Sequence, residues 1–301
     1  MIRTENLTKT FGGICAVNDI SITLKEGEIF GLTGTNGAGK TTFLRLLSGI
    51  ISQDKGTVLI DDEPVFDNRK AKENLFYVPS DLYFFVNSSP KDMGAYYATV
   101  YSKFRMDRFR KLVDDFDLGW TRRIQTYSKG MKRQLAILLG LCAGTKYIFM
   151  DETFDGLDPV MRQAVKSLIA EEMSDNGLTP VISSHNLREI EDVCDHVGLL
   201  HKGGILLSED VADMKTEIRK LQCVFQNEDE QRKAEKMLNI LNCRVDGRLR
   251  TYVVRGTEDQ IQGTMKEIET VYAEVVPLTL EEIFISETEA VGYDVRKLIL
   301  D

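Results

Sequence analysis

A glycine-rich segment between an apolar run and a helix-like run constrains this 301-residue chain more than any other feature. Residues 34–41 read Gly-Thr-Asn-Gly-Ala-Gly-Lys-Thr and match the pattern G-x-x-x-x-G-K-[ST], directly after the apolar run 28–32. Glycines let backbone N–H groups surround phosphate oxygens, and the following helix directs the positive end of its dipole toward them. The segment therefore predicts strand, phosphate-binding loop and helix, in preference to a glycine-rich turn with a solvated lysine.

The loop also predicts individual contacts to a nucleotide. Lys40 is expected to reach the terminal phosphates, and the Thr41 hydroxyl is expected to ligate Mg²⁺. The remaining predicted nucleotide-binding positions in the loop are Asn36, Gly37, Ala38, Gly39 and Thr42. The loop alone leaves open whether the chain is a kinase, a GTPase or a motor.

Two adjacent acids follow the short apolar run 147–150, as expected of a buried parallel strand whose carboxyl end faces the ligand. Asp151 is predicted to hold the Mg²⁺ shell through water. Glu152 is predicted to polarise the water that attacks the γ-phosphate, because phosphoryl transfer depends on positioning and electrostatic stabilisation. For Glu152 taken alone, a solvated acid at a strand end is the alternative.

Three further segments carry information, one before the two acids in the chain and two after them. Residues 126–134 open a helix-like run, with Ser128 as a natural N-cap, which is also its plain structural interpretation. Residues 155–159 read Asp-Gly-Leu-Asp-Pro, and His185 ends the strand-like run that begins at Val181. A single histidine is more often packed or solvated than functional.

Together, these segments resemble the ATP-binding cassette (ABC) ATPases over about residues 1–215. The resemblance implies ATP and Mg²⁺ as ligands and a head-to-tail dimer, in which Ser128 and Gly130 donate to the γ-phosphate of the partner's ATP. It further implies that His185 contacts the γ-phosphate of its own site and that Asp158 couples the two sites. Phe11 matches the aromatic that stacks on adenine, with a core aromatic near a turn as the alternative.

The chain departs from the family pattern in two places. Lys129 and Met131 replace the usual glycine and glutamine beside Ser128, and Lys129 adds positive charge where backbone normally approaches phosphate. Ser80 stands where the family carries a glutamine that touches Mg²⁺ and the attacking water, so we expect a water or Asp81 to fill the gap. Hydrolysis is expected to survive, with Lys40, Glu152 and His185 as the catalytic set.

Composition and charge argue against a nucleic-acid partner, a membrane-spanning segment and a cysteine metal site. The net charge of −9 argues against a nucleic-acid partner, and no apolar stretch approaches the roughly 18 residues that span a bilayer. Five cysteines are scattered without metal-ligand spacing, as expected of free thiols in a reducing compartment. The expected location is peripheral, on the cytoplasmic face of the cell membrane.

The predicted fold class is α/β: a P-loop core of ABC type with an antiparallel β layer and a helical subdomain at about 88–142. The antiparallel layer is expected from the short runs 2–8, 20–24 and 57–60. Residues 216–301 are predicted to form a small α+β domain, separate from the ATPase domain 1–215. Its β-α-β-β-α-β order is ferredoxin-like, with a dimerisation or regulatory role.

The C-terminal pattern resembles the ATPase subunits of bacterial ABC-2-type exporters. This resemblance implies a homodimer or a heterodimer with a second ABC ATPase, which drives a separate membrane permease and exports a peptide, drug or amphiphile. The aromatic run 83–86 lies where relatives form the groove for the permease, with core packing as the alternative. Two other functions stay open: a soluble ABC-type ATPase acting on ribosomes or nucleic acid, and a non-hydrolysing regulatory module.

Overall fold

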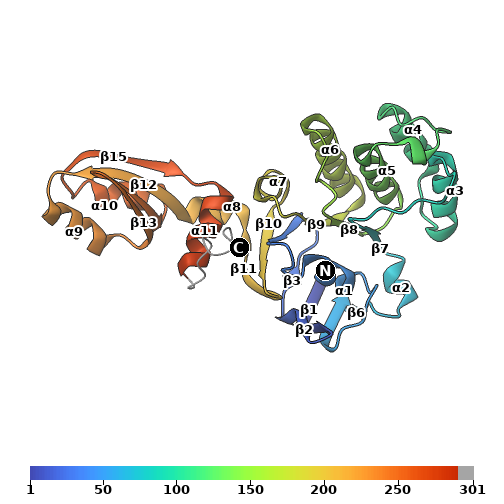
Figure 1. The fold of residues 1–301 in the computed structure, drawn as a ribbon, viewed down its shortest axis with the longest axis horizontal. Helices are drawn as coiled ribbons and strands as arrows, with labels where there is room; N and C mark the ends of the chain where they lie inside the picture. The colour runs from blue at the N-terminus through green and yellow to red at the C-terminus, as the bar shows by residue number, and fades with distance from the viewer. Residues whose placement is uncertain (291–301) are drawn as a thin grey trace. The chain divides into compact units, whose positions relative to one another are not determined.

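The computed structural model describes residues 1–290, with side chains through residue 286. The chain separates into two compact units, Met1–Ser208 and a second that begins at Glu209 (Figure 1). The second domain was predicted to run to residue 301, and residues 291–301 lie outside the described part of the chain.

A six-stranded sheet forms the centre of the first unit, in the order β11-β10-β4-β9-β8-β7. Neighbouring strands from β10 to β7 run parallel, and every residue of β8 and β9 is buried, as expected when both faces of a parallel sheet are covered. The carboxyl ends of β4, β8 and β9 therefore lie side by side. The strands are β4 (Phe30–Gly34), β7 (Leu75–Val78), β8 (Tyr147–Asp151), β9 (Thr179–Ser183), β10 (His196–His201) and β11 (Gly204–Asp210).

Helices follow three of these strands and bury apolar side chains against the sheet. In the helix after β4, Phe43, Leu44, Leu46 and Leu47 are buried, which explains why this short segment is helical in spite of two threonines. The helices that flank the sheet are α1 (Lys40–Leu47), α5 (Lys129–Cys142), α6 (Pro159–Asn176) and α7 (Leu187–Val193).

A separate antiparallel layer is built from strands that lie before and after β4 in the chain, in the order β2-β1-β5-β6, with β3 paired to β1. The layer was predicted, but the expectation of one strand over residues 20–24 was wrong. Strand β2 ends at Ile20 and was missed because only Val17 and Ile20 are buried in it, so it lacks an apolar alternation. The strands are β1 (Ile2–Phe11), β2 (Ile14–Ile20), β3 (Thr23–Leu24), β5 (Lys55–Ile60) and β6 (Glu63–Pro64).

Helical segments connect β7 to β8, as the sequence predicts. Ser89 begins one of them with a capping box, in which its side chain accepts from the Asp92 N–H and the Asp92 carboxylate accepts from the Ser89 N–H. These segments, with the short helix before β7, are α2 (Arg69–Lys72), α3 (Pro90–Val100), α4 (Met106–Asp115) and the 3₁₀ turn η1 (Ile124–Thr126), which leads into α5. The predicted fold class is confirmed.

The second unit is a four-stranded antiparallel sheet in the order β13-β14-β12-β15 with its own apolar core. The predicted β-α-β-β-α-β order is present. The two helices were expected over residues 229–241 and 258–270, but they end earlier, at Met237 and Met265. After Met237 the backbone turns extended at Leu238, and the apolar residues that follow join a strand. The elements are α8 (Val211–Glu217), β12 (Ile218–Phe225), α9 (Glu228–Met237), β13 (Ile240–Asp246), β14 (Leu249–Arg255), α10 (Glu258–Met265), β15 (Thr270–Pro277) and α11 (Leu280–Ala290).

Among residues 1–290, no helix combines the length and the apolar character that crossing a membrane requires.

Candidate functional site

The loop between β4 and α1 has the geometry of an anion cradle. Gly37 and Gly39 both adopt positive φ, at 79° and 108°, which L side chains rarely adopt. A Cβ on Gly39 would lie 2.2 Å from the Ala16 carbonyl oxygen, so the loop also needs glycine there for space. At Gly37 a Cβ would meet open space, which leaves this side of the loop accessible to a ligand.

Lys40 lies buried at the start of α1, beneath this loop. Its Nζ donates to the carbonyl oxygens of Gly34 and Thr35, at 2.7 and 3.3 Å, and lies 3.9 Å from Glu152 Oε1. Burial lowers the pKa of Lys40, whereas the neighbouring acids oppose that shift, Glu152 most strongly. A buried ammonium held mainly by neutral carbonyls fits a site that takes up phosphate charge.

Asp151 is a hydrogen-bond hub at the end of β8. The hydroxyls of Thr41 and Ser183 donate to its Oδ1, at 3.2 and 2.7 Å, and the Tyr77 hydroxyl donates to its Oδ2 at 3.2 Å. The carboxylate is fully buried. The oxygen atoms of Thr41 and Asp151 are hard ligands, so this corner fits Mg²⁺ held between the loop and β8.

Glu152 and His185 lie beside this hub. Glu152 adopts φ of +50°, an uncommon backbone for a non-glycine residue, and its N–H donates to the carbonyl oxygen and the Oγ of Ser183. Its carboxylate is partly exposed, and Oε1 lies 3.8 Å from Nδ1 of His185. The structure thus brings together the carboxylate predicted as base, the histidine and Lys40.

The residues predicted to serve a partner's nucleotide lie at helix starts. The Ser128 Oγ caps α5 by accepting from the Met131 N–H, and Asp158 caps α6 by accepting from the Met161 N–H. Gly130 faces the loop after β8, because a Cβ there would lie 3.3 Å from the Gly156 carbonyl oxygen. Helix capping alone accounts for Ser128 and Asp158 at these positions. The roles expected of them across a dimer therefore stay predictions.

Ser80 and Phe11 are not among the described residues that hydrogen-bond to Asp151, which are Thr41, Tyr77 and Ser183. Ser80 lines a cavity of about 290 Å³ together with Asp81, Leu82, Lys129, Lys132 and Arg133. Its predicted Mg²⁺ contact stays a prediction. Phe11 is half exposed at the end of β1, with the Lys9 ammonium 5.4 Å from its ring centre. An exposed ring at this turn is available to stack, and the alternative of a core aromatic does not describe it.

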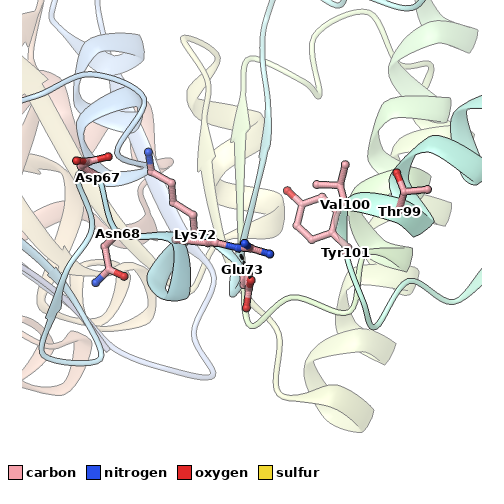
Figure 2. Close-up of a pocket in the computed structure, with 8 residues that line it drawn as sticks. Asp67, Asn68, Lys72, Glu73, Thr99, Val100 and Tyr101 are labelled. Carbon is pink, nitrogen blue, oxygen red and sulfur yellow. Dashed lines mark hydrogen bonds and ion pairs between the residues drawn. The ribbon is translucent and has the colours of Figure 1, made fainter.

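A second hollow lies between α2 and the end of α3, with a volume of about 550 Å³. Figure 2 shows Lys72 and Glu73 on one side of it, and Val100 and Tyr101 on the other. Next to it, exposed rings of Tyr83, Phe85 and Tyr96 stack edge to face. We call these three rings the aromatic strip.

Sequence reasoning assigned no role to Tyr77, Ser183 or Asp155, each of which contacts the predicted site residues. Ser183 carried one available signal, because it is a polar residue at the end of an apolar strand, two residues before His185. In the structure it pairs in register with Asp151. Tyr77 carries a hydroxyl within an otherwise apolar strand. This hydroxyl reaches Asp151 only because β7 pairs with β8 in the sheet.

Comparisons with known proteins agree with this geometry. The family model described as ABC transporter matches residues 17–155. The ABC transporter ATP-binding protein YtrB of Bacillus subtilis (strain 168) is 30% identical, over 95% of this chain and 98% of its own length. The bacitracin transport ATP-binding protein BcrA of Bacillus licheniformis is 32% identical, over 68% of each chain. The solved dimeric post-hydrolysis state of the cassette MJ0796, bound to ADP and Pi, superposes with a TM-score of 0.63 at 19% identity, over 70% of this chain and 99% of that one.

Proposed function

Since the chain belongs to the ATP-binding proteins of ABC transporters, we propose that it hydrolyses ATP at the Lys40–Asp151–Glu152 corner and uses this reaction to drive a separate permease. The observation that carries this proposal is the meeting of four groups at one sheet edge: a buried lysine, a Thr41–Asp151 pair, a partly exposed carboxylate and a histidine. Each group matches one need of phosphoryl transfer.

The division of labour follows from the contacts. Lys40 balances the charge of the terminal phosphates, and the loop N–H groups with the α1 N-terminus hold the others. Thr41 and Asp151 would hold Mg²⁺, whose role is to neutralise charge that develops on the phosphate oxygens. Glu152 accepts a hydrogen bond from the attacking water, because its carboxylate is the acid nearest Lys40 that solvent reaches.

We propose that two cassettes close around ATP, each completing the other's site with Ser128, Gly130 and Asp158. The support is that both helix starts lie at the surface of the first unit, with N–H groups available beyond those that the caps occupy. The MJ0796 cassette of similar fold was solved as a dimer. The partner cassette is either a second copy or a related chain.

The hollow between α2 and α3 is proposed as the docking site for a cytosolic segment of the permease. Tyr96 and Val100 are one helical turn apart on α3, so the aromatic strip and the hollow share one face. Both side chains are exposed, and an exposed apolar patch beside a groove is typical of partner sites. The location follows: peripheral, at the cytoplasmic face of a membrane.

The class of substrate is inferred from relatives alone. BcrA is named for bacitracin transport, and another relative of Bacillus subtilis, LnrL, for linearmycin resistance, at 29% identity over 68% of this chain and of its own. We propose export of a peptide, drug or amphiphile.

Hydrolysis is tested with purified chain by Mg²⁺-dependent phosphate release from ATP. Glu152→Gln keeps the shape of the site but removes the proton acceptor, so we expect release to fall by about 10²–10⁴-fold. ATP affinity is retained, and ATP shifts the variant to a dimer in size-exclusion chromatography with light scattering. Near-normal turnover of Glu152→Gln would refute the assigned base, and a wild-type chain without turnover would favour the regulatory-module alternative.

A further inference from the structure

The loop from Thr153 to Asp158 carries an acid against the catalytic histidine. Asp155 Oδ2 lies 3.3 Å from Nδ1 of His185, closer than Glu152 Oε1 at 3.8 Å to the same nitrogen. Asp155 is part-buried, whereas the histidine is half exposed. None of the roles assigned above uses this carboxylate, although it lies closer to the imidazole than the Glu152 carboxylate does.

The backbone on both sides of His185 is fixed by a second acid, the buried Glu189 of α7. The Ser184 Oγ donates to Glu189 Oε2 at 2.8 Å, and the Asn186 Nδ2 donates to Oε1 at 3.4 Å. Arg162 of α6 neutralises this acid through an ion pair of 3.1 Å. Glu189 therefore holds the peptide that carries the histidine but leaves rotation of the ring to another contact.

Charges from four directions meet at Asp155. His185 faces it from the loop after β9, Glu152 from the end of β8, Glu189 from α7 and Lys40 from α1. Burial raises the pKa of Asp155 to about 6, reinforced by a hydrogen bond to Glu189 and its charge, and His185 opposes this shift. The carboxylate is thus ionised above about pH 6 and loses its charge below it.

We propose that Asp155 is a positioning residue, which fixes the His185 imidazole through Nδ1 and so leaves Nε2 for the terminal phosphate of ATP. This inference rests on the proposed ATPase function and adds a residue to its site. Glu189 holds the backbone and Asp155 holds the ring, so the histidine is oriented before nucleotide binds. A carboxylate that accepts a hydrogen bond from one ring nitrogen also sets which of the two nitrogens carries the proton.

The orientation is tested without turnover by ¹⁵N–¹H correlation of the histidine side chains in the full chain. Only three histidines are present, so His185→Gln identifies the signal. We expect a protected Nδ1 proton on His185 in the wild type and in Asp155→Glu, weaker protection in Asp155→Asn, whose amide oxygen is a neutral acceptor, and loss of protection in Asp155→Ala. The same Nδ1 signal in all four proteins would overturn the inference. This readout stands even if the wild type hydrolyses no ATP, which would refute the ATPase proposal instead.

Kinetics give the second readout. In Asp155→Asn we expect kcat to fall about tenfold, the lower end of the loss found when a group that orients a functional histidine is removed, with the KM for ATP changed less than about twofold. The wild-type kcat should fall as pH drops through about 6, because Asp155 then gains a proton, and this limb should flatten in Asp155→Asn. Asp155→Glu should recover part of kcat, and the exposed Asp175→Asn on α6 should match the wild type. An Asp155→Asn enzyme with the wild-type kcat and acid limb would contradict the proposal.

Discussion

Tyr77 shows how a single hydroxyl supports the proposed metal corner. It donates to Asp151 Oδ2, and burial together with the Asp151 charge raises the pKa of its phenol, so the group stays a proton donor at neutral pH. The two Asp151 oxygens then keep fixed directions. The phenol acts on the acid, which in turn would act on Mg²⁺, so its effect is indirect.

We predict that Tyr77→Phe weakens the apparent Mg²⁺ affinity in phosphate release by about 10–100-fold, the range found when groups that hydrogen-bond to metal ligands are removed. The measurement is a Mg²⁺ titration at saturating ATP. Tyr252→Phe, which removes a hydroxyl bound to Glu235 in the second unit, is the matched control and should leave the titration unchanged. Equal Mg²⁺ curves for Tyr77→Phe and wild type would remove Tyr77 from the site.

At the scale of an element, the phosphate loop depends on glycine for two separable reasons. Gly37 and Gly39 share the left-handed backbone, but only Gly39 lacks room for a Cβ. Conformation alone costs an alanine about 1–2 kcal/mol. A Cβ against the Ala16 carbonyl adds a steric cost, since backbone cannot move as a side chain does.

We therefore predict that Gly39→Ala lowers the free energy of unfolding by about 1–3 kcal/mol more than Gly37→Ala does. Urea unfolding of the two variants checks the difference. Equal losses would mean that the loop relaxes around Gly39 and that its close approach to β2 does not matter for stability.

The helical subdomain is tied to the core helix α6 by an ion network. Glu172 is buried, and both Arg105 and Arg108 pair with it, while Arg105 also donates to the Leu141 carbonyl oxygen. The adjacent Glu171 pairs with Arg108 in a far more exposed position. Removing the buried acid would leave two guanidinium groups without their shared partner.

We predict that Glu172→Gln lowers the free energy of unfolding of the first unit by about 2 kcal/mol or more. The lower bound is smaller than the usual cost of breaking a buried ion pair, because both arginines are partly exposed. Glu171→Gln is the control, with an expected loss of about 0–1 kcal/mol. Thermal unfolding followed by calorimetry compares them. If the two variants melt alike, the network does not hold α4 against α6.

Sequence reasoning worked best where chemistry lies in one short segment. The loop with Lys40 and Thr41 and the acids at 151 and 152 could be placed at one sheet edge, because strand order and polarity follow from the motifs. Asp155 and Tyr77 could not be given partners, since those contacts depend on side-chain directions between separate strands and loops. Strand β2 and the ends of α9 and α10 were misjudged because local apolar patterns do not show which residues the sheet will pair.

For the whole molecule, two units with separate cores carry separate tasks in our account. The first unit holds the proposed ATPase corner and the docking hollow. The second is a ferredoxin-like sheet, for which we propose support of the dimer. The structure divides its compact units between Ser208 and Glu209, whereas the sequence prediction divides the chain after residue 215. The dimer and the permease contact remain predictions that isolation of a single complex would test together.

The most direct test of the transporter account is affinity capture of Glu152→Gln from detergent-solubilised membranes with ATP and Mg²⁺, followed by mass spectrometry. The account predicts a multi-spanning membrane protein in stoichiometric amount, and its loss when Tyr96→Ala and Val100→Ala are added. The exposed Val245→Ala in the second unit is the control and should retain it. Recovery with ribosomes or nucleic acid alone, or with no partner, would contradict the account and favour a soluble ATPase.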